Sequence, residues 1–180
     1  ADSYLVTGVY SYVAGSLPWS VKWLAVLLGH SGNRERGKQE LETAAARALL
    51  AGDDARAVLS LIYTREKRFD QAAGKMAELR LRYPENYIAH LELAGLELRR
   101  KRTGQAIAIY GEILSLIEAG GRYRRLEPAV VHNRMGVAYR VAGKTNTAIG
   151  YFQRVMESAS ASDQVKTIAR LELGKTLDIT

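Results

Sequence analysis

The segment Asp53–Asn86 reads DDARAVLSLIYTREKRFDQAAGKMAELRLRYPEN and contains two runs of apolar and small residues at helical spacing. The positions that carry the spacing are Leu59, Ser60 and Tyr63, then Ala72, Met76 and Leu79, with Pro84 closing the segment. Residues three and four positions apart lie on one side of an α-helix, so each run predicts an amphipathic helix. A tight turn between the two runs would make them a helical hairpin.

The same arrangement of small and large residues returns twice further along the chain. One copy begins at Tyr87 and the other begins near Ala129. Their matching positions are Leu93, Ala94, Ala106, Tyr110 and Ile113, and then Met135, Gly136, Tyr139, Ala148, Phe152 and Val155. In each second helix a small residue (Ala72, Ala106, Ala148) would let two helices approach closely, and a large residue four places later would fill the space on the same face.

These residues resemble the signature of the tetratricopeptide repeat (TPR), in the form found in bacterial TPR proteins of unassigned role. The resemblance implies an all-α fold, namely a right-handed α-α superhelix (TPR solenoid) of about ten helices. The repeats would occupy residues 53–86, 87–128 and 129–161. Residues 1–52 would form divergent TPR-like helices, and residues 162–180 a capping helix.

The spacing between repeats is longer at one place. Tyr87 and Ala129 are 42 positions apart, whereas Asp53 and Tyr87 are 34 apart. The additional residues fall around 119–126, which predicts a glycine-led loop or an extended helix end. Insertions in repeat proteins tend to lie in loops that can serve binding.

Helices are also expected on both sides of the three repeats. Residues 33–50 predict a helix with Asn33 as N-cap and with Gly37, Leu41 and Ala44 on its inner face. Its partner is expected to be a helix over residues 18–28, and a further apolar helix is expected over residues 2–14. In the capping helix, the residues expected to face inward are Val165, Ile168, Ala169, Leu171 and Leu173.

Residues 5–50 also resemble, more loosely, the fungal and animal TPR family linked to inclusion-body clearance at organelle surfaces. The matching runs are Gly8-Val9-Tyr10, Gly15 to Trp19, Lys22 to Leu24, Leu27 to Gly29 and Gly32 to Gly37. This likeness also implies a scaffold and not a reaction. Trp19 and Trp23 are expected to be core residues, with a membrane or partner patch as the alternative.

The sequence contains no recognisable motif of a catalytic or metal-binding site. It contains no cysteine and three histidines, and no nucleophile elbow, phosphate loop or EF-hand loop. His90 and His132 occupy equivalent packing positions early in a first helix, and His30 follows a helix end. We therefore expect no enzyme, no cofactor and no bound metal.

The concave side of a TPR domain is lined by the first helix of each pair. By that resemblance the partner-binding groove would be lined by Arg65, Glu92, Arg99, Asn133, Arg134, Val137 and Arg140. Such a groove would accept a peptide or a helix, with arginines suited to carboxylates. TPR co-chaperones grip a C-terminal carboxylate at fixed groove positions, which here hold Ala57, Leu61, Glu92, Val130 and Arg134. Only Arg134 matches, so that binding mode is not expected.

Basic residues form two clusters in a chain with a formal net charge of +7. Residues 99–102 (Arg-Arg-Lys-Arg) end a helix, where cations favour the helix dipole. Arg122, Tyr123, Arg124 and Arg125 lie in the insertion, where arginines beside an aromatic ring could contact an anionic polymer or a membrane surface. Nucleic acid is the less favoured of these ligands.

The sequence therefore favours a protein-interaction scaffold or adaptor. The alternatives are binding of an anionic polymer or membrane surface through the arginine clusters, and a regulatory segment of a larger enzyme. The longest apolar stretch, residues 17–29, is too short to span a bilayer and contains Lys22, so no transmembrane segment is expected. We expect a soluble protein, either cytoplasmic or periplasmic, and read the start at Ala1 as a piece of a longer protein.

Overall fold

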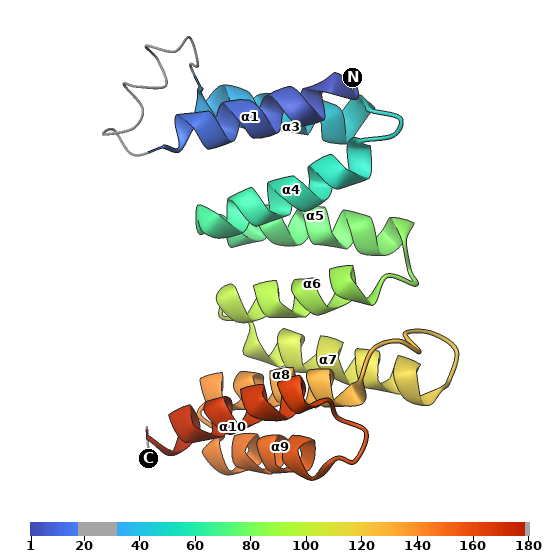
Figure 1. Ribbon diagram of the computed structural model, residues 1–180, viewed down its shortest axis with the longest axis vertical. Helices are drawn as coiled ribbons and strands as arrows, with labels where there is room; N and C mark the ends of the chain where they lie inside the picture. Colours follow the sequence, from blue (N-terminus) through green and yellow to red (C-terminus); the bar gives the residue numbers. More distant parts are fainter. Residues whose placement is uncertain (18–31, 179–180) are drawn as a thin grey trace. The chain divides into compact units, whose positions relative to one another are not determined.

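The computed structural model describes residues 1–17 and 32–178, and all regular elements in these residues are α-helices (Figure 1). The nine described helices are α1 (Ser3–Gly15), α3 (Arg34–Arg47), α4 (Gly52–Arg65), α5 (Phe69–Arg82), α6 (Tyr87–Arg99), α7 (Thr103–Glu118), α8 (Pro128–Val141), α9 (Thr145–Glu157) and α10 (Asp163–Leu177). The all-α prediction is confirmed, and nine described helices are close to the ten expected. The helix predicted over 18–28, with Trp19 and Trp23, lies outside the described residues, as does His30.

The chain divides into two compact units, Ala1–Leu79 and Arg80–Thr180. The boundary falls within the last turn of α5. The first unit contains α1, α3, α4 and most of α5. The second contains α6 to α10.

In the first unit α1 packs directly against α3 through glycines. A Cβ atom on Gly37 would lie 2.5 Å from the backbone nitrogen of Tyr12 and 2.6 Å from the carbonyl oxygen of Gly8. This close backbone contact pairs α1 with α3, which the sequence did not predict. The predicted pairing of α3 with residues 18–28 lies outside the described residues. As predicted, Gly37, Leu41 and Ala44 are buried, and the Asn33 side chain caps α3 by accepting from the N–H groups of Glu35 and Arg36.

In the second unit each helix packs on the next one along the chain. The small residues of the second helices are fully buried, as are their large neighbours Tyr110 and Phe152. Gly136 on α8 leaves room for the Phe152 ring, because a Cβ atom there would lie 2.5 Å from a ring carbon. Small residues on one helix thus receive large residues from the next, as the repeat spacing predicts.

The capping helix α10 buries a narrower face than the sequence predicts. Ala169 is fully buried where α10 packs against α8 and α9, but Ile168 is 41% exposed and Leu171 is 59% exposed. The prediction that both face inward is wrong. The contacts with α8 and α9 cover one side of α10, and Ile168 and Leu171 lie on the side left uncovered.

The turn that joins the two helices of each repeat has the same geometry in all three repeats. The residues after α4, α6 and α8 adopt a left-handed backbone, with φ of 60° at Lys67, 62° at Lys101 and 73° at Gly143. The next N–H group in each turn donates back to a carbonyl oxygen five residues earlier: Arg68 to Tyr63, Arg102 to Glu97 and Lys144 to Tyr139. This is the Schellman arrangement that ends many helices.

Candidate functional site

Six of the seven predicted groove residues lie in the second unit, on two first helices. Glu92 and Arg99 belong to α6, and Asn133, Arg134, Val137 and Arg140 belong to α8. The two helices run in the same direction and contact each other. Arg65, the seventh, ends α4 in the first unit, where it is exposed.

The centre of this surface is an ion pair between the two helices. A guanidinium nitrogen of Arg134 lies 3.4 Å from a carboxylate oxygen of Glu92, and the two side chains are 40% and 51% exposed. A surface pair of this kind contributes little to stability. Arg134 also interacts with the hydroxyl group of the buried Tyr110, so its guanidinium group has a second partner inside the protein.

Asn133 adds an unsatisfied acceptor beside this pair. Its side-chain Oδ1 atom is buried and has no hydrogen-bond partner among the described residues. Buried polar atoms are normally hydrogen-bonded, so an unsatisfied one needs an explanation.

Arg140 is used within the protein. Its guanidinium group donates to a Glu172 carboxylate oxygen at 2.6 Å, to the Glu172 carbonyl oxygen at 3.2 Å and to Thr176 at 3.5 Å. Burial alone would raise the pKa of Glu172, but hydrogen bonds and charge from Lys175 and Arg140 lower it below its ordinary value. Arg140 therefore fastens α10 to α8.

The insertion loop is held against α6 by Tyr123, and this corrects one expectation. The Tyr123 side chain is buried, with φ of 62°, and its hydroxyl donates to the Pro84 carbonyl oxygen at 3.2 Å. The ring meets Tyr87 and His90 edge-on. A buried ring cannot contact an external polymer or membrane, so the prediction that Tyr123 contributes to the binding surface of the loop is wrong.

The arginines of the loop remain at the surface. Arg122 pairs with Glu85 at 3.0 Å, and Arg124 donates from Nε to the Gly120 carbonyl oxygen at 2.9 Å. Arg125 is exposed. Arg122 and Arg124 thus contact other groups of the protein, whereas Arg125 is presented to solvent.

His90 is a packing residue, as the sequence predicts. It is fully buried, and its Nδ1 atom lies 3.0 Å from the Tyr123 hydroxyl. The direction of this hydrogen bond is set by the tautomer of His90, whose Nε2 atom lies 3.6 Å from a Glu112 carboxylate oxygen. Burial lowers the pKa of His90, assisted by the charge of Arg80 and opposed by Glu112.

Replacing Tyr123 by phenylalanine is expected to destabilise the second unit by about 1–2 kcal/mol, because His90 Nδ1 and the Pro84 carbonyl would both lose their partner. Urea unfolding followed by circular dichroism would measure the loss. Tyr83→Phe, at a half-exposed side chain of the same unit, is the control and should change stability less, because its hydroxyl group is not buried. Equal losses of stability in the two variants would show that the buried Tyr123 hydroxyl contributes no more than the hydroxyl of the half-exposed Tyr83.

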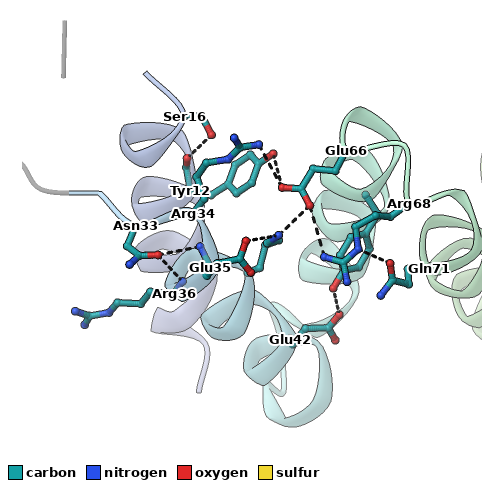
Figure 2. A network of polar contacts seen from close by, with 12 residues as sticks. Tyr12, Ser16, Asn33, Arg34, Glu35, Arg36, Glu42, Glu66, Arg68 and Gln71 are labelled. Carbon is teal, nitrogen blue, oxygen red and sulfur yellow. Dashed lines mark hydrogen bonds and ion pairs between the residues drawn. The ribbon is translucent and has the colours of Figure 1, made fainter. Parts of the chain in front are cut away.

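The first unit contains a polar network that the sequence analysis did not identify (Figure 2). Its centre is Glu66, at the end of α4, whose carboxylate accepts from Tyr12, Arg34 and Lys38 at 3.4, 3.3 and 2.9 Å. Burial would raise the pKa of Glu66, but Lys38, Arg34 and Arg68 lower it below its ordinary value. Since Tyr12 is 54 residues away in sequence, no local pattern indicated this network.

Within residues 1–17 and 32–178, no group of three or more His, Asp or Glu side chains is placed to hold a metal ion. In the same residues, no helix combines the length and apolar character needed to cross a bilayer.

A search of solved structures finds MamA of AMB-1, in crystal form P212121, with a TM-score of 0.55 over 92% of each chain at 21% sequence identity. MamA contains TPRs. The present chain has a TPR-type fold. A scan against protein-family models finds no match, and a search of curated proteins finds none. None of these comparisons tests the looser likeness of residues 5–50 to the inclusion-body-clearance family.

Proposed function

We propose that this TPR-type chain is a protein-interaction adaptor that binds a peptide or helix of a partner along α6 and α8. The observation that carries the proposal is the half-exposed Glu92–Arg134 pair between α6 and α8. Asn133, the residue before Arg134, adds an acceptor atom that has no partner among the described residues. A TPR-type fold is typically an interaction scaffold, and helical-repeat proteins bind partners on surfaces of this kind.

The chemistry of the surface indicates the kind of peptide. Arg134 favours a carboxylate and Glu92 favours a cation. Asn133 can accept from an amide N–H group once its side chain turns to expose the buried Oδ1 atom. Val137, half-buried one turn after Asn133, offers a small apolar contact. A peptide with an acidic residue, a nearby basic residue and one aliphatic side chain would satisfy all four groups.

The test is selection of peptides from a random phage-displayed library on the immobilised chain, followed by fluorescence titration of the enriched peptides. We expect Asn133→Ala and Arg134→Ala each to weaken binding by about ten-fold, the effect of one lost hydrogen bond to a charged group. Arg125→Ala, outside the surface, is the control and should bind normally. Failure to enrich any peptide, or equal binding by all three variants, would refute the proposal.

A further inference from the structure

Most of the net positive charge lies in the second unit. Residues 80–180 contain 16 Lys and Arg against 10 Asp and Glu, a formal charge of +6 out of +7 for the chain. Part of this charge sits at the α6–α7 and α8–α9 turns, which lie at the same end of the unit (Figure 1). We call Lys101, Arg102 and Lys144 the basic edge.

Helix stability does not account for basic residues at these positions. Lys101 adopts a left-handed backbone that strains any side chain, and Gly143 occupies the equivalent position in the next repeat. Arg102 and Lys144 are the N-caps of α7 and α9, yet neither side chain caps its helix. Ser, Thr, Asn and Asp are the residues preferred there. In a turn between two helices, a cation is favoured by the dipole of the helix that ends there and disfavoured by the dipole of the helix that begins there. These two effects oppose each other.

The cations of the edge are weakly paired. Arg102 is half exposed and lies 3.9 Å from Glu97, a buried carboxylate that Arg100 already contacts at 2.6 Å. Lys101 is exposed, and Lys144 is exposed with its amine 6.0 Å from the Tyr139 ring centre. Asp178, which follows α10 at this end, offsets one charge. The edge is therefore free to contact an anionic surface.

Two exposed aliphatic side chains accompany the cations. Val141, the last residue of α8, is 57% exposed, and Leu177, the last residue of α10, is 52% exposed. Arg140 contacts Thr176, so these two helix ends are neighbours. Cations beside aliphatic groups suit an anionic lipid surface, where the charges meet headgroups and the aliphatic groups enter the interface. Nucleic-acid binding would instead favour exposed aromatic rings, and Tyr139 is stacked on Tyr151.

We propose that the basic edge of the second unit docks on an anionic membrane surface. This role is independent of the peptide surface on α6 and α8. The edge consists of turns at the ends of helices, so docking there leaves Asn133 and Arg134, within α8, available to a partner.

The test is co-sedimentation of the full chain with phosphatidylcholine vesicles that contain or lack phosphatidylserine. The double variant R102S/K144S is expected to bind phosphatidylserine vesicles about 30-fold more weakly, since each basic residue near such a surface contributes about five-fold. Serine is a preferred N-cap, so the same variant should unfold at a higher temperature than the unmodified chain. Weaker binding by a more stable protein cannot result from misfolding.

The matched control is R124S/R125S, which removes the same charge at the opposite end of the unit. The helix α8 between the two ends is about 21 Å long, more than twice the screening length at physiological salt. The control should therefore bind nearly normally. Equal losses in both variants, no binding of the unmodified chain to phosphatidylserine vesicles, or displacement from vesicles by equimolar RNA would each overturn the proposal.

Discussion

Replacing Gly37 by alanine is expected to destabilise the first unit by about 3 kcal/mol, at the upper end of the range for overpacked contacts. The new methyl group would lie 2.5 Å from the Tyr12 nitrogen and 2.6 Å from the Gly8 oxygen. Both are backbone atoms of α1, so no side-chain rotation can relieve the contact and α1 must move away from α3. Alanine's higher helix propensity would recover only about 1 kcal/mol.

Urea unfolding followed by far-ultraviolet circular dichroism would measure this loss. The matched control is Gly74→Ala on α5, where no atom lies within 4 Å of the added methyl group. That variant should be more stable than the unmodified chain by up to about 1 kcal/mol, because only helix propensity changes. A Gly37→Ala protein as stable as Gly74→Ala would show that α1 and α3 do not meet through Gly37.

Replacing Glu66 by alanine is expected to cost roughly 3 kcal/mol, as removal of one partner from a buried ion pair usually does. The variant would leave Lys38, which is only 6% exposed, with Glu35 as its remaining ion-pair partner. Tyr12 and Arg34 would also lose an acceptor. The control is Glu78→Ala, because Glu78 also meets two cations, Arg56 and Lys75, but is half exposed. Its loss should cost about 1 kcal/mol or less.

The contribution of Glu66 should depend on pH in a defined direction. The pKa of Glu66 is lower in the folded protein than in the unfolded chain, so the folded state favours the ionised form. The stability difference between the unmodified chain and Glu66→Gln should be complete at neutral pH. It should shrink as the pH falls below the ordinary glutamate value of about 4.3 and through the lowered one. A difference that stays constant from pH 7 to pH 3 would contradict the ionic role of Glu66.

The repeat register placed the proposed groove residues of the second unit on α6 and α8, but it did not predict their side-chain partners. Glu92, Asn133 and Arg134 lie on neighbouring first helices, as the repeat register requires. Arg140 belongs to the same register, yet it is held by Glu172 of α10. A register places a residue on a helix face, whereas its partners come from whichever helix packs opposite. Only the packed structure shows them.

The sequence by itself determined the helical repeat and the faces on which its helices pack. Small and large residues spaced three and four positions apart lie on one face of a helix, so the pattern can be read without knowing the rest of the fold. Ala72, Ala106 and Ala148 are fully buried for that reason. The tertiary structure decided the α1–α3 pairing, the Glu66 network and the burial of Tyr123, which bonds Pro84 from 39 residues away. These features depend on residues that are distant in sequence and meet only after the chain has folded, so no local spacing predicts them.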